Sequence, residues 1–106
     1  MIEVVKLTSP PVTFRTVLIV EVKNSQHWTS GIPALDRQLS RQTDAAFAGT
    51  AHTKVYWIGT IGPHWRYGEK EDNRQSPVPL IGWHETTHDA ASYADLKKLA
   101  ALVHAL

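Results

Sequence analysis

The stretch that decides the fold is Thr16-Val17-Leu18-Ile19-Val20-Glu21-Val22-Lys23, an apolar run that ends with two charged residues. It is rich in β-branched residues, which favour a β-strand. A strand this apolar is expected near the centre of a sheet, covered on both faces. Because side chains alternate along a strand, Glu21 and Lys23 share one face, that of Ile19. A carboxylate and an ammonium group are therefore predicted side by side at one end of this strand.

A second β-branched segment, Ile2–Leu7, precedes this strand. The residues between them, Thr8-Ser9-Pro10-Pro11, cannot continue a strand ladder. The two segments are therefore predicted to pair as a hairpin with a long loop. Symmetric pairing about that loop places Glu3 opposite Val20 or Glu21, and a slip of one residue would change the face to which Glu3 belongs.

Two helices are predicted further along the chain. The first spans about 32–48, because Ser30 offers a cap, Pro33 suits the first turn and Gly49 ends the helix. Its inward stripe contains one polar residue and consists of Leu35, Leu39, Gln42 and Ala46. The second helix spans about 92–105 and starts at a variant capping box that begins with Ser92. Its apolar face consists of Leu96, Leu99, Ala100 and Val103.

Two further strands complete the predicted fold. Lys54–Gly62 is the third strand, and Leu80-Ile81-Gly82-Trp83 is a short fourth strand. Gly68–Pro79, which contains charges and two prolines, is expected to be a mobile loop or the tip of a hairpin. The element order is therefore β-β-α-β-β-α, which predicts an α/β fold with a mixed sheet.

Composition excludes several classes of protein. The chain has 106 residues, of which 42% are hydrophobic and 20% charged, as in an ordinary globular protein rather than a disordered one. Its longest apolar run, Val17–Val20, is too short to span a membrane, and the first residues lack the features of a secretory signal. We expect one intracellular domain over residues 1–106, with no membrane partner.

Charge and cysteine content narrow the chemistry. The sequence has no cysteine, which excludes disulfides, thiolate catalysis and cysteine-containing zinc sites. His, Asp and Glu remain as metal ligands. The net charge of +1 gives no global basic field, so any contact with nucleic acid must be local.

Three segments carry a resemblance to a known superfamily. They are Val17–Lys23, Arg41-Gln42-Thr43-Asp44-Ala45-Ala46-Phe47 and Ile58-Gly59-Thr60-Ile61-Gly62-Pro63-His64-Trp65-Arg66. A hairpin whose second strand ends in Glu-x-Lys, followed by a helix and another strand, resembles the core of the PD-(D/E)XK nuclease-like superfamily. The three segments are similar to uncharacterised fungal proteins of that superfamily. The resemblance implies a restriction-endonuclease-like sheet and a metal-dependent nuclease that acts on nucleic acid.

The resemblance also implies a role for each site residue. Glu21 and a second acidic residue on the preceding strand, for which Glu3 is the candidate, would hold Mg²⁺ or Mn²⁺ through oxygen. Lys23 would position or deprotonate the attacking water and offset charge in the transition state. Gln42 matches a glutamine that the family often carries on the following helix. Glu21, Lys23 and Gln42 are thus the candidate catalytic residues.

Two departures from the family pattern leave a second interpretation open. No Pro-Asp pair precedes the first strand, and the helix that usually opens the fold is missing, so the chain is either truncated at its N-terminus or a reduced member. A catalytically inactive binding or structural module with the nuclease fold is therefore the alternative. The Glu-x-Lys pattern is also weak by itself, because Asp95-Leu96-Lys97 repeats it and a salt bridge at a strand end would explain it.

The segment His84-Glu85-Thr86-Thr87-His88 is a literal H-E-x-x-H motif. Zinc hydrolases carry this motif on a helix, so that both imidazoles reach one ion. Gly82 and the two threonines disfavour a helix here, and no third ligand follows at a family spacing. We predict a loop or strand end over about 83–89, with a zinc hydrolase as the rival interpretation.

Two helices and a hairpin leave one face of the predicted sheet thinly covered. We expect a second subunit to supply the missing cover, which predicts a homodimer.

Overall fold

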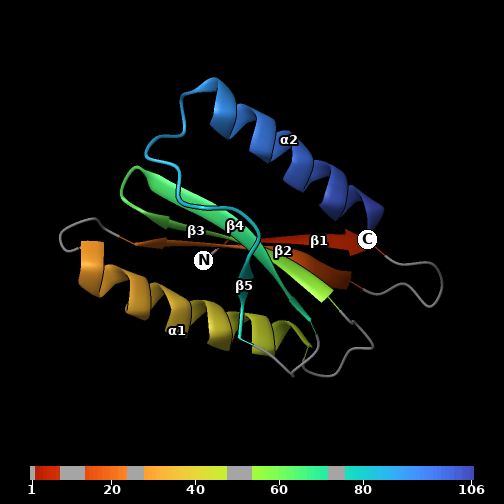
Figure 1. Ribbon diagram of the computed structural model, residues 1–106. Coiled ribbons are helices and arrows are strands. Elements are labelled where there is room, and N and C mark those ends of the chain that lie inside the picture. Colours follow the sequence, from red (N-terminus) through yellow and green to blue (C-terminus); the bar gives the residue numbers. More distant parts are fainter. Residues whose placement is uncertain (1, 8–13, 24–27, 48–53, 72–75) are drawn as a thin grey trace.

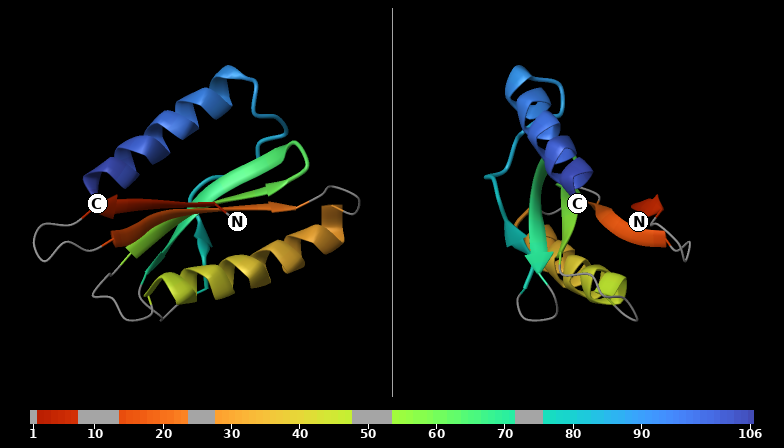
Figure 2. Two further views of the ribbon diagram at one scale, coloured as in Figure 1. Left: turned by 180° about the vertical axis from the view of Figure 1, so that it is seen from behind. Right: turned by 90° about the vertical axis from the view of Figure 1, so that its right-hand side faces the viewer.

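The computed structural model describes residues 2–7, 14–23, 28–47, 54–71 and 76–106. Five strands and two helices follow one another in these residues: β1 (Ile2–Leu7), β2 (Phe14–Lys23), α1 (Trp28–Phe47), β3 (Lys54–Ile61), β4 (His64–Glu71), β5 (Val78–Pro79) and α2 (Ala90–Ala105). The strands form one mixed sheet, and the two helices lie on opposite faces of it (Figures 1 and 2). The predicted α/β class, with a mixed sheet and two helices, is confirmed.

The sheet has the strand order β1-β2-β3-β4-β5. β2 and β3 are parallel, and the other neighbouring strands are antiparallel. Parallel strands need a crossover connection, and α1 lies within this one. β2 therefore has the interior position predicted for it. Cover on both faces, however, was a wrong prediction for the end of this strand, because Val22 is 61% exposed.

The β3–β4 hairpin was missed by the sequence prediction. Gly62 and Pro63 form its two-residue turn, and Gly62 has a φ of 57°, a left-handed conformation that glycine adopts without strain. β3 therefore ends at Ile61, one residue before the predicted end. The following residues, His64–Glu71, return as a full strand beside β3.

Part of the predicted loop Gly68–Pro79 is strand, which corrects the sequence prediction. The charged residues of β4 are paired instead of being free in solvent: Arg66 contacts Asp36 of α1 at 3.3 Å, and Lys70 contacts Asp44 of the same helix. The expected strand Leu80–Trp83 is also wrong. The two-residue strand β5 pairs with β4 in its place.

Helix α1 begins at Trp28, earlier than predicted, so Ser30 and Pro33 lie inside it. Its buried stripe also differs from the prediction and consists of Leu35, Leu39, Thr43 and Phe47. Gln42 is half-buried at the margin of that stripe. Thr43 is tolerated in this buried stripe because its hydroxyl donates a hydrogen bond to the Leu39 carbonyl at 2.7 Å. Gly49, the expected stop, lies outside the described residues.

Helix α2 is capped by Asp89 instead of the predicted Ser92. The Asp89 carboxylate accepts a hydrogen bond from the Ser92 backbone N–H at 2.8 Å, which lowers the pKa of Asp89. Ser92 is itself buried: its hydroxyl accepts from the Trp65 indole at 2.9 Å and donates to the Thr86 carbonyl at 2.6 Å. The start of α2 is thus held against β4 by hydrogen bonds.

The apolar core lies on both faces of the sheet. On the α1 face, Leu35 and Leu39 pack with Trp57 and Ile61. The α2 face has its own buried cluster, which consists of Tyr56, Trp65, Tyr67 and Leu99. Among the described residues, no helix has the length and apolar character required to cross a membrane.

Candidate functional site at the α1–β2 seam

Glu21 lies near the carboxyl end of β2, on the face covered by α1. Ile19, two residues earlier, packs against Phe47 of α1, and Glu21 shares that face by the alternation of the strand. Glu21 is only 8% exposed. One of its carboxylate oxygens, Oε2, is buried without a hydrogen-bond partner. Burying a carboxylate in this way is costly, so the position calls for a functional explanation.

Gln38 of α1 supplies a second unpartnered oxygen. Its amide oxygen, Oε1, is buried without a hydrogen-bond partner. Gly59 of β3 is the register partner of Glu21, and a Cβ at Gly59 would lie 2.9 Å from Leu35 and 3.3 Å from Leu39. Leu35 and Leu39 therefore pack over Gly59, beside Glu21. Gln38 lies on this same turn of α1.

The flanks of α1 show which strand each polar residue faces. Asp36 and Asp44 lie on one flank, and both contact β4. At about 100° per residue, Gln38 and Gln42 lie on the other flank, which faces β2 because β2 and β4 are on opposite sides of β3. We name this region, formed by Glu21, Lys23, Gln38 and Gln42, the α1–β2 seam.

Lys23 and Gln42, both predicted from the sequence, lie toward opposite ends of the seam, because α1 runs antiparallel to β2. The start of α1 lies beside Ile61, the register partner of Lys23, and its end packs on Ile19. Lys23 is half-buried at the last position of β2, two residues after Glu21, and its carbonyl accepts a hydrogen bond from Gly62 at 2.9 Å. Gln42 lies one turn beyond Gln38 on the same flank. Sequence reasoning selected Gln42 and missed Gln38, although their spacing of four residues places them on one side of a helix.

Glu3 occupies a register position different from the predicted one. It pairs with Ile19, not with Val20 or Glu21, because β2 begins at Phe14, two residues before the predicted Thr16, and Leu7 pairs with Phe14. A register shift between Val4 and Val5 then moves Glu3 one residue along β2, from Leu18 to Ile19. Glu3 is thus a diagonal neighbour of Glu21, and such Cα atoms are about 7–8 Å apart. The side chain of Glu3 lies outside what the structure describes.

The donors of the seam suit a hard cation. The carboxylate oxygen of Glu21 and the amide oxygen of Gln38 are the oxygen ligands that Mg²⁺ prefers. Within the described side chains, no group of three or more His, Asp or Glu residues is close enough to hold an ion. A complete ligand set would therefore need Glu3, water or substrate oxygens in addition to Glu21.

The H-E-x-x-H segment lies in a loop that precedes α2, as predicted. The His84 ring stacks on Trp65, with centroids 4.9 Å apart, and its Nε2 lies 2.6 Å from an Asp95 carboxylate oxygen. His84 thereby helps to attach α2 to β4, whereas His88 is exposed. Because the segment is not helical, the spacing of four residues does not direct the two imidazoles to one ion.

Comparison of the chain with protein-family models, with curated proteins and with solved structures found no match.

Proposed function

We propose that this chain is a metal-dependent nuclease-like domain that acts on phosphodiesters of nucleic acid, with its sheet arranged as in restriction endonucleases. One observation carries the proposal: the carboxylate of Glu21 is buried, and its Oε2 has no hydrogen-bond partner. A buried carboxylate is strongly unfavourable unless a cation or a proton neutralises it. A divalent cation at this position would turn an unfavourable burial into a binding site.

The order of the elements supports the proposal. A β-hairpin, a helix and a strand parallel to the second hairpin strand are the arrangement that the resemblance leads us to expect. Glu21 and Lys23 lie at the carboxyl end of β2, beside the carboxyl end of β3. Ligands of open α/β sheets bind beyond the carboxyl ends of the strands. The seam therefore lies where a substrate of such a sheet would be expected.

Each residue of the seam has a role in this proposal. Glu21, with Glu3 on the neighbouring strand, would hold Mg²⁺ or Mn²⁺, and Gln38 Oε1 is a further oxygen donor. The bound ion would supply Lewis-acid stabilisation of charge on the phosphate. Lys23 would orient the attacking water and donate hydrogen bonds to phosphate oxygens as negative charge develops. Gln42, one turn beyond Gln38 on the side away from the carboxyl end of β2, would hydrogen-bond to water within the seam.

The test is cleavage of single-stranded and double-stranded DNA and RNA in the presence of Mg²⁺ or Mn²⁺. We expect Glu21→Ala and Lys23→Ala each to lower the cleavage rate by about 100-fold or more, in the range seen when one electrostatic contributor is removed. Glu85→Ala and Lys98→Ala, which change exposed residues, are matched controls and should cleave like the wild type. Activity that survives both seam substitutions would overturn the proposal.

A catalytically inactive module is the second candidate function. It is favoured by the absence of a group of three metal-ligating side chains among the described residues. In that case nucleic acid would bind without being cleaved, and Lys23→Ala would weaken the binding more than Lys98→Ala. The same protein preparations decide between the two candidates, because binding and cleavage are measured on the same substrates.

A further inference from the structure

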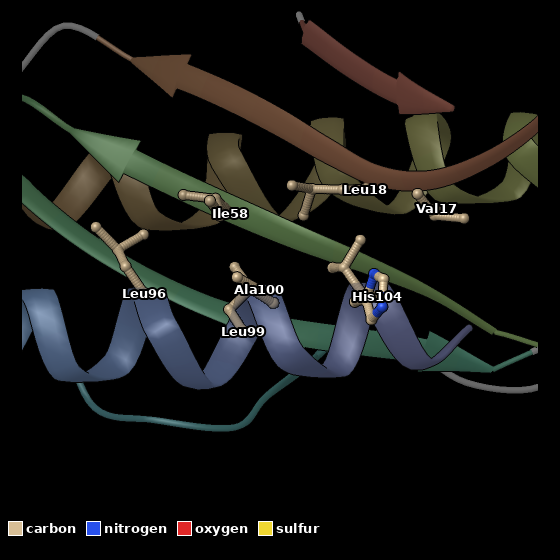
Figure 3. A pocket seen from close by; sticks show the side chains of 8 residues that line it. Val17, Leu18, Ile58, Leu96, Leu99, Ala100 and His104 are labelled. Atoms are coloured by element: carbon tan, nitrogen blue, oxygen red, sulfur yellow. The ribbon is translucent and has the colours of Figure 1, made fainter. Parts of the chain in front are cut away.

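An apolar groove runs between α2 and the sheet, on the face opposite the α1–β2 seam (Figure 3). Its volume is about 380 Å³. Three elements line it, and one polar side chain is included: Val17, Leu18, Ile58, Leu96, Leu99, Ala100, Val103 and His104. In Figure 3, Leu96 lies toward one end of the groove and His104 toward the other. Such a lining fits apolar side chains better than a charged or sugar-like ligand.

The same face also carries apolar side chains that project from the surface. Val22 is 61% exposed and Tyr93 is 65% exposed. Val22 lies two residues after Val20, which pairs with Ile58 of the groove. Tyr93 lies one helical turn before Leu96. Both projections are thus beyond the Leu96 end of the groove. One continuous face therefore combines a hollow with projecting groups.

A face that has both a hollow and projecting groups can pair with a second copy of itself. A two-fold axis between the hollow and the projections would insert the projecting groups of each copy into the groove of the other, because a two-fold interface uses one patch twice. We propose that this face of α2 and β2 joins two copies of the chain into a homodimer. A net charge of only +1 means that two copies repel each other little.

The chain as a whole exposes more surface than a compact monomer of its mass. The accessible surface is 6486 Å², whereas a monomer of this mass exposes about 5,900 Å². The surplus is about 600 Å² over the whole chain, and an interface of standard size buries roughly 800 Å² on each partner. The radius of gyration, 14.0 Å, likewise exceeds the roughly 13 Å of a compact domain of this length. A molecule this extended has surface to cover, and a second copy on the open face would bury the exposed apolar groups Val22, Tyr93 and Leu96.

The test uses two leucines of α2 that have nearly equal exposure. Leu96, 38% exposed, lines the groove, and Leu102, 37% exposed, does not. In sedimentation equilibrium at micromolar concentration, we expect the wild type and Leu102→Glu to be dimers. Leu96→Glu should raise the dimer dissociation constant by about 100-fold, because it places an unpaired charge in the interface.

Circular dichroism shows whether each variant is folded, and Ala100→Glu provides a second variant at an exposed position in the groove. A wild-type chain that is monomeric at these concentrations would overturn the proposal. Equal weakening by Leu96→Glu and Leu102→Glu would also overturn it. The nuclease proposal does not depend on the result, because the seam and the groove are on opposite faces of the sheet.

Discussion

At the scale of single residues, Glu21 shows how function can be opposed to stability. Its carboxylate occupies a position on β2 where the preceding residue on the same face, Ile19, is fully buried. An apolar residue there would continue the core that α1 covers. The charged residue is therefore a stability cost that a binding role would explain.

We predict that Glu21→Gln raises the stability of the metal-free protein by about 1–3 kcal/mol, the cost of an unsatisfied buried group. The amide has nearly the same shape as the carboxylate, carries no charge, and brings an N–H donor to the seam where Gln38 Oε1 lacks a partner. Urea unfolding in the presence of a chelator measures the change. Glu85→Gln, at an exposed position, is the control and should leave stability unchanged. A destabilised Glu21→Gln variant would show that the carboxylate is satisfied without metal.

Residue patterns predicted only part of this site. The alternation of β2 was sufficient to place Glu21 and Lys23 together, because it depends on local strand geometry. The position of Glu3 depends on the irregular pairing of β1 with β2, which no local pattern reveals. The choice between Gln38 and Gln42 depends on how α1 packs over β3, and that is a tertiary property.

At the scale of elements, β4 shows why charged strands are missed. Its sequence, His-Trp-Arg-Tyr-Gly-Glu-Lys-Glu, has the composition of a loop in its second half. The strand is stable because neighbouring elements supply opposite charges: Lys54 of β3 lies 3.1 Å from Glu69, and α1 supplies the partners of Arg66 and Lys70. By contrast, β2, β3 and the two helices were predicted, because their hydrophobic patterns can be recognised within each segment alone.

We predict that Gly68→Ala destabilises the protein by about 1–3 kcal/mol, as overpacking of a core does. A Cβ at Gly68 would overlap the carbonyl oxygen of Val78 in β5 and the ring of Trp57, so β5 would have to separate from β4. Thermal unfolding measures the loss. Gly82→Ala is the matched control, because nothing lies within 4 Å of a Cβ there. Equal effects of the two substitutions would contradict the packing of β5 on Gly68.

At the scale of the whole molecule, the two faces of the sheet are covered differently. On one face, α1 packs directly on β2 and β3 through its buried stripe of Leu35, Leu39, Thr43 and Phe47. On the other face, α2 is held at its start by Ser92 and His84 and leaves a groove over β2. The charged site and the open apolar surface are therefore separated by the thickness of the sheet.

Dimerisation through the open face makes stability depend on protein concentration, since association favours the folded state by mass action. We predict that the midpoint of thermal unfolding rises by about 6 °C for a 100-fold increase in concentration, from the usual unfolding entropy of two chains of this length. Differential scanning fluorimetry across that range measures the shift, and Leu102→Glu should show the same slope. Leu96→Glu should show a smaller rise, because its weaker dimer dissociates to folded monomers over part of that range, and a folded monomer unfolds without a change in the number of particles. A flat wild-type response would mean that the open face of the sheet is stable in water without a second copy.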